Sequence, residues 1–264
     1  EDLKAKQIRF VGDAETRIEE DALRLLRFFR FHAWYGAGEI DQKGLVAARK
    51  KVSLLRGLSA ERIHSELLRL LGAPDPMATV EAMLTHNIFE AFLPEVTSAD
   101  TLKIFIQLEG RCDPLVRLVA LTDKAQIADK NSIPKRLKFS TAEKQHFLSL
   151  IKPEIVIDLS TDDQTFREAL YRCGAGLVSD LLRLEMARIG KSFEEDRAQV
   201  LAKTIKAWRP VFFPLQGRDL IKSGLKPGPQ MGRTLKMTEQ WWIDQAFSPT
   251  QDDCLKFALG NELL

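Results

Sequence analysis

The sequence predicts an all-α protein, an elongated array of short helices with at most a remnant strand at its amino terminus. Apolar residues recur at helical spacing along most of the 264 residues. Only residues 8–11 (Ile-Arg-Phe-Val) have a strand pattern, and a single strand cannot form a sheet. The composition, with 45% hydrophobic and 29% charged residues, is that of a soluble chain with a core, and no apolar run is long enough to span a membrane.

Capping residues, glycines and prolines mark the predicted helices. The pattern Thr16-x-x-Glu19 is a capping box, and apolar residues then continue at helical spacing to about Trp34. Ser59 is expected to cap a helix with a strong apolar stripe, ended by Gly72. The other helices are predicted over residues 43–55, 77–86, 101–109, 115–123, 141–150, 162–173, 177–189 and 194–208.

The carboxyl-terminal part of the chain is basic. Between Ala202 and Gln240 there are eight lysines and arginines against two acids, while the whole chain has a net charge of only +2. A basic end on a slightly acidic body predicts a polyanionic partner that is met by one end of the molecule. The alternative is a solvated helical face, and charge alone does not decide between the two.

A carboxylate and a guanidinium occur three residues apart, at Asp21 and Arg24, directly after Glu20. On one helix they would share a face. Cytosine and adenine each present an amino donor beside a ring-nitrogen acceptor, so one such pair complements both bases. Uracil and guanine present a carbonyl and an N–H at the same positions. Leaving buried polar groups mispaired is costly enough to make the site prefer the matching bases by orders of magnitude. The alternative is an ordinary surface ion pair.

The complete string over residues 2–31 resembles the head-to-neck junction of the class II nucleotidyltransferases, the CCA-adding enzymes and bacterial poly(A) polymerases. Asp2, Leu3, Ile8 and Arg9 match its first piece, and residues 17–30 match the RI-x-ED-x-LR-x-LR segment that opens the neck. Ala14 stands where many relatives have proline. The resemblance implies that Asp21 and Arg24 read the incoming nucleotide and that Glu20 supports them.

Two further motifs resemble the same family. Taken alone, the segment over residues 59–71 is typical of an amphipathic helix with an Arg62–Glu66 pair, and the alternative for residues 217–235 is a flexible, basic surface loop. The resemblance implies that the first motif supports the neck and that the second holds tRNA, where glycines let the backbone approach phosphate. The implied neck-support residues are Arg9, Arg17, Ser59, Glu61 and Arg62, and the implied tRNA-binding residues are Arg218, Lys222, Lys226, Gly228, Gly232 and Arg233.

The resemblance implies a linker remnant over residues 1–15, a neck over 16–75, a body over 76–209 and a basic tail over 210–264. The intact protein is then expected to add CCA to tRNA from CTP and ATP. Mg²⁺ would be held by the carboxylates of an upstream head, so this chain alone is expected to be inactive and to hold no metal. A poly(A) polymerase and a non-catalytic helical RNA-binding or adaptor module remain alternatives. Scattered cysteines indicate reduced thiols in the cytoplasm, and Trp241 and Trp242 are expected to pack in a core.

Overall fold

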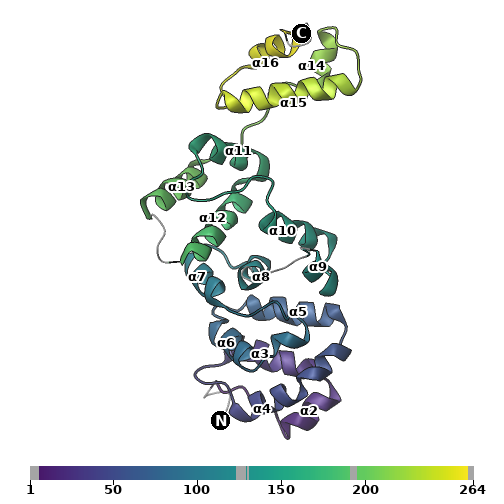
Figure 1. Cartoon of the computed structure of the whole chain (residues 1–264), viewed down its shortest axis with the longest axis vertical. Coiled ribbons are helices and arrows are strands. Elements are labelled where there is room, and N and C mark those ends of the chain that lie inside the picture. Colours follow the sequence, from purple (N-terminus) through teal and green to yellow (C-terminus); the bar gives the residue numbers. More distant parts are fainter. Residues whose placement is uncertain (1–5, 123–128, 130, 191–194, 261–264) are drawn as a thin grey trace. The chain divides into compact units, whose positions relative to one another are not determined.

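The computed structural model describes residues 6–122, 129, 131–190 and 195–260. These residues form fifteen α-helices and two short 3-10 helices, and none of them is in a strand, which confirms the all-α prediction (Figure 1). The chain divides into two compact units. Unit 1 comprises Glu1–Val156 and Asp180–Glu194, and unit 2 comprises Ile157–Ser179 and Glu195–Leu264.

The amino-terminal part of unit 1 is built from helices α2 (Ala14–Glu20), α3 (Leu23–Tyr35), α4 (Gln42–Lys51), α5 (Ala60–Leu71) and α6 (Met77–Thr85), with η1 (Val52–Gly57) between α4 and α5. Helix α3 packs against α5 and α6, and α2 packs against α4. The core between them includes Ile18, Leu25, Phe29, Leu67 and Leu70, which are at most 3% exposed. The apolar stripes predicted from spacing therefore face this core.

The single helix predicted from Thr16 to Trp34 is wrong. The structure has two helices here, and the N-cap of the first, α2, is Asp13 instead of Thr16. The Asp13 carboxylate accepts hydrogen bonds from the Thr16 N–H at 2.8 Å and the Thr16 hydroxyl at 2.7 Å. Helix α2 then ends at Glu20, because Asp21 adopts an extended conformation with φ −153° and ψ 104°. The Asp21 side chain accepts the N–H of Leu23 at 3.1 Å, so a local side-chain bond replaces helical pairing and starts a second helix.

The rest of unit 1 comprises η2 (Phe89–Ala91), α7 (Asp100–Leu108), α8 (Pro114–Thr122), α9 (Ser132–Arg136), α10 (Thr141–Ile151) and most of α12 (Ala175–Ile189). Helix α8 is buried along its length, from Leu115 to Thr122. Helix α10 begins at a complete capping box between Ser140 and Glu143. A predicted end at residue 123 lies outside the described residues, as does a predicted start at residue 194.

Unit 2 contains α11 (Asp163–Cys173), α13 (Glu195–Ala207), α14 (Gly217–Lys222), α15 (Pro229–Asp244) and α16 (Gln251–Gly260). Trp242 is 3% exposed and belongs to its core, and Trp241 packs against that core. The Trp241 ring also stacks on Phe257 with centroids 4.3 Å apart, so the prediction that both tryptophans pack in a core is confirmed. The core residues are Leu215, Leu220, Trp242, Ile243, Cys254 and Ala258.

Candidate nucleotide-binding and RNA-binding sites

The Asp21 carboxylate lies at the break between α2 and α3 and contacts α5. Besides the Leu23 N–H, it accepts hydrogen bonds from Nη2 of Arg62, at 3.2 Å to Oδ1 and 3.4 Å to Oδ2. Arg62 lies in the first turn of α5. The Asp21 side chain is 29% exposed, so a ligand can still reach it. The carboxylate is thus oriented by a residue 41 positions along the chain.

Arg24 lies in the first turn of α3 and is held by α2. Its Nη1 donates to Oε2 of Glu20 and, at 3.1 Å, to the carbonyl oxygen of Arg17. Arg17 itself donates to the same Glu20 oxygen at 2.6 Å. The hydrogen bond from Arg24 lowers the pKa of Glu20 below its ordinary value, so Glu20 is ionised at neutral pH.

Asp21 and Arg24 therefore have separate partners, Arg62 and Glu20. The side chain of Arg24 is 32% exposed, and the hydrogen bonds it makes to described residues use Nη1. The Nε and Nη2 of Arg24 can still donate hydrogen bonds to a ligand, and the partly exposed Asp21 carboxylate can still accept them. This arrangement replaces the shared helical face that was predicted for the two residues. Their roles in base reading stay predictions.

The helix over residues 60–71 carries different contacts from those predicted. Ser59 is its N-cap residue, although its side chain makes no capping hydrogen bond, and Glu61 lies in its first turn. The predicted Arg62–Glu66 pair is wrong, because Arg62 turns to Asp21. Glu66 is instead buried against α3, 3.5 Å from Nε of Arg27 and 3.2 Å from Nε of Arg30. The sequence contained a signal for this contact, since Arg27 and Arg30 are three residues apart on α3.

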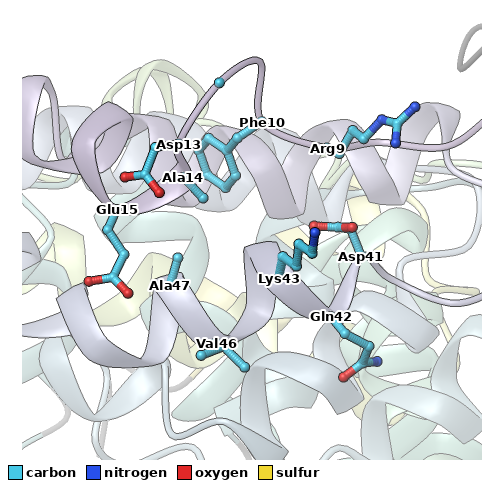
Figure 2. Close-up of a pocket in the computed structure, with 11 residues that line it drawn as sticks. Arg9, Phe10, Asp13, Ala14, Glu15, Asp41, Gln42, Lys43, Val46 and Ala47 are labelled. Atoms are coloured by element: carbon cyan, nitrogen blue, oxygen red, sulfur yellow. The ribbon is translucent and has the colours of Figure 1, made fainter.

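Arg9 lies apart from the Asp21 contacts, in the segment before α2. It lines a cavity of about 820 Å³ between this segment and the start of α4. Figure 2 shows Arg9 and Phe10 on one side of that cavity and Gln42 and Val46 of α4 on the other. Residues 21 and 24 are not among those lining it. The neck-support role of Arg9 stays a prediction, and the matching Asp2 and Leu3 lie outside the described residues.

The predicted tRNA-binding residues all lie in unit 2, around α14 and α15. Arg218 and Lys222 lie on α14, Lys226 lies in the loop that follows, and Arg233 lies on α15. All four side chains are exposed. Gly228 is the N-cap of α15, and no side chain caps this end of the helix, where Pro229 has no N–H and the Met231 N–H donates to the Gly228 carbonyl oxygen at 3.1 Å. Gly232 is exposed in the next turn.

The two acids within the basic stretch are engaged by uncharged groups. Asp219 accepts the N–H of Gln216 at 2.9 Å, and Glu239 accepts the hydroxyl of Tyr171 at 2.5 Å. Burial, followed by this bond to Glu239, raises the pKa of Tyr171 above its ordinary value. The structure thus leaves the positive charges of the stretch facing solvent without neutralisation by its own acids.

The described part of the chain contains neither a metal-binding cluster nor a membrane-spanning helix. Within it, no three His, Cys, Asp or Glu side chains gather in a way that could hold a metal ion. None of its helices has the length and apolar character needed to cross a membrane.

The chain is similar to known proteins over nearly its whole length. Residues 39–100 match a family model described as the probable RNA and SrmB-binding site of polymerase A. The mitochondrial CCA tRNA nucleotidyltransferase 1 of Mus musculus is 28% identical over 263 residues, which cover 97% of this chain. The match covers 59% of the mouse protein, so the chain spans well under two thirds of that relative.

Two solved structures have the same fold. The Bacillus stearothermophilus CCA-adding enzyme in complex with CTP matches with a TM-score of 0.74 and 17% identity, covering 99% of this chain and 67% of that one. The Thermotoga maritima CCA-adding enzyme complexed with tRNA matches with a TM-score of 0.61 and 15% identity, covering 98% and 65%. At these identities the likeness is one of fold.

Proposed function

We propose that this chain, which is like the neck, body and tail of the class II CCA-adding enzymes, reads the base of CTP or ATP and holds a tRNA during CCA addition. The observation that carries the proposal is the pair Asp21 and Arg24, each partly exposed and each held by its own partner. Attack of the tRNA 3′-hydroxyl on the nucleotide would take place in a catalytic head beyond this chain.

The chemistry of base selection follows from the edges of the four bases. The Asp21 oxygens accept a hydrogen bond from the amino group of cytosine or adenine, and an Arg24 N–H donates a hydrogen bond to the neighbouring ring nitrogen. Uracil and guanine place a carbonyl oxygen against the carboxylate and an N–H against the guanidinium. Both contacts are repulsive, and each leaves a desolvated group without a partner, which costs about 1 to 3 kcal/mol.

The tail supplies a second, sequence-independent contact. Lys222, Lys226 and Arg233 are exposed, and the uncapped start of α15 lies among them in the sequence. Lysine and arginine side chains and helix N-termini are the groups that commonly bind phosphates. The similarity in fold to an enzyme complexed with tRNA supports this part of the proposal.

The metal and the cellular location belong to the same proposal. Mg²⁺ would be held by the head and would neutralise charge on the triphosphate, while Asp21 and Arg24 orient the base and the basic tail orients the RNA. A cytoplasmic location is proposed from the three scattered cysteines, which form no CxxC pair.

The proposal is tested by base selection in the protein that includes the head. Asp21→Ala and Arg24→Ala should each reduce the preference for C and A over U and G by at least about tenfold. Each variant loses one hydrogen bond to the base, and a loss of about 1.4 kcal/mol corresponds to a tenfold change. The measurement is incorporation of each labelled nucleotide into tRNA. The matched controls are Glu81→Ala and Lys103→Ala, which break an exposed ion pair of 3.1 Å elsewhere in unit 1.

Unchanged UTP and GTP incorporation in both variants would mean that Asp21 and Arg24 are ordinary surface charges with no part in base selection. The chain alone should incorporate nothing, and turnover above a no-enzyme control would place the catalytic site within these residues. The match to a polymerase A family model favours one second candidate, a poly(A) polymerase. That enzyme would extend RNA with ATP and reject CTP, so the same assay separates the two.

A further inference from the structure

Phe212 is an aromatic side chain that the fold leaves in solvent. It is 83% exposed, whereas the next most exposed aromatic of the described residues, Tyr35, is 60% exposed. Isolated apolar residues are common on protein surfaces, so exposure alone assigns no role. Two further features of its surroundings distinguish Phe212 from an incidental surface residue.

The first feature is that the neighbours of Phe212 are anchored. It lies in the non-helical segment over residues 208–216, between α13 and α14. Val211 and Phe213 on either side pack against the core of unit 2, and the Phe213 ring lies 5.6 Å from that of Trp242. Pro210 and Pro214 flank the segment and restrict its backbone. Alternate burial thus anchors the backbone on both sides of Phe212 and turns its ring toward solvent.

The second feature is the charge of the surrounding sequence. Phe212 lies within the stretch from Ala202 to Gln240, where eight basic residues face two acids. Arg209 donates to the carbonyl oxygen of Lys206 in the last turn of α13, at 3.4 Å, and to that of Trp208 just after it, at 3.1 Å. The remaining basic side chains are exposed. An exposed aromatic face within a basic stretch is the combination by which proteins hold unpaired nucleotides.

We propose that Phe212 is a stacking platform for an unpaired base of the RNA held by the tail. The proposal rests on the proposed tRNA-binding function and adds a contact that does not depend on phosphate charge. A base stacks on an aromatic face whatever its identity, so this contact would favour RNA with accessible loop bases over a continuous duplex.

The test compares three variants of this chain in binding to a transcribed tRNA and to a fully paired RNA duplex. Phe212→Ala should weaken tRNA binding by at least about fivefold, since stacking contributes about 1 to 3 kcal/mol per base. Phe212→Trp should retain the affinity. Phe212→Leu is the matched control, because it keeps apolar area without an aromatic face. Since the side chain is exposed, thermal melts of all three should match that of the parent.

The salt dependence and the duplex identify the kind of contact. Stacking releases no counterions, so Phe212→Ala should leave the log–log slope of affinity against salt unchanged. Binding to the duplex should not change either. In tRNAs that carry 2-aminopurine at one loop position each, stacking on an aromatic ring quenches the fluorescence. At one of these positions the parent should quench the 2-aminopurine fluorescence and the Phe212→Ala variant should not.

Two results would overturn the proposal. Equal tRNA affinity in Phe212→Ala and the parent removes Phe212 from the RNA contact. Full affinity in Phe212→Leu indicates an apolar contact, as with a protein partner, instead of stacking. If Lys226→Ala with Arg233→Ala still lowers the salt slope in either case, the tRNA-binding function of the tail stands without Phe212. If the parent itself does not bind tRNA, both proposals fail.

Discussion

Removal of Arg117 tests whether a buried ion pair holds the end of α5. The Arg117 side chain is 2% exposed in the middle of α8, and its Nε donates to both oxygens of Glu109 at 3.1 Å. Its Nη1 donates to the carbonyl oxygens of Leu71 and Ala73, each at 2.5 Å. One guanidinium therefore ties the end of α5 to α8 and to the residue that follows α7.

The expected cost follows from what the substitution leaves behind. Arg117→Met keeps most of the side-chain length but strands the Glu109 carboxylate, which is 9% exposed, and two carbonyl oxygens. Removing one partner of a buried ion pair costs about 3 to 5 kcal/mol, a large part of the 5 to 15 kcal/mol of a typical domain. Arg117→Met with Glu109→Leu should be more stable than Arg117→Met alone, because no charge is then stranded.

The measurement is native-state hydrogen exchange by mass spectrometry, read on peptides from α5, α7 and α8. It reports the opening free energy of these helices even if the two compact units unfold separately. The matched control is Lys103→Met, which breaks the exposed pair with Glu81 and should cost under about 1 kcal/mol. A cost below about 1 kcal/mol for Arg117→Met, or a double variant no more stable than the single one, would refute the reasoning.

Two other changes have equally definite outcomes. Replacing Lys226 and Arg233 together by alanine should reduce the log–log salt slope of tRNA binding by about 1 to 2, whereas Lys135→Ala with Lys144→Ala, two exposed lysines of unit 1, should leave it unchanged. An unaltered slope in the tail variant would remove both residues from the RNA surface. Burial lowers the pKa of His64 from its ordinary value of about 6.5, so the folded state binds fewer protons and stability should fall as pH drops through about 6.5. His64→Gln should flatten this pH dependence of the melting temperature, and a profile identical to that of the parent would contradict the assignment.

Helix positions could be predicted because boundary residues mark them. Ser59 and Asp162 precede α5 and α11 as their N-cap residues, and most of the other predicted helices that the structure describes agree within two residues. The helix predicted over residues 43–55 is an exception, since α4 ends at Lys51 and the 3-10 helix η1 follows. The break at Asp21 could not be predicted in the same way. Apolar residues keep their spacing across it, and the break depends on one hydrogen bond from the Leu23 N–H to a side chain.

The candidate site was only partly predictable for a related reason. Motifs identified Asp21, Arg24 and Arg62, but spacing paired Arg62 with Glu66 on its own helix. The structure pairs it with Asp21 because α5 packs across α3, where Glu66 is taken by Arg27 and Arg30. Such contacts depend on helix packing, which local sequence spacing does not contain. Arg117 was missed although one arginine in an apolar helix indicates a buried partner.

The separate pairing of Asp21 and Arg24 has a consequence for base reading. If the two side chains formed an ion pair with each other, an incoming base would first have to separate them or compete for their hydrogen bonds. Here Arg62 holds Asp21 and Glu20 holds Arg24, so each charge keeps a compensating partner while each side chain stays partly exposed. Preorganised partners of this kind reduce the ordering needed on binding. Under the proposed function, the two motifs, about forty residues apart in sequence, form one site: one would supply the groups that meet the base, and the other keeps the carboxylate oriented.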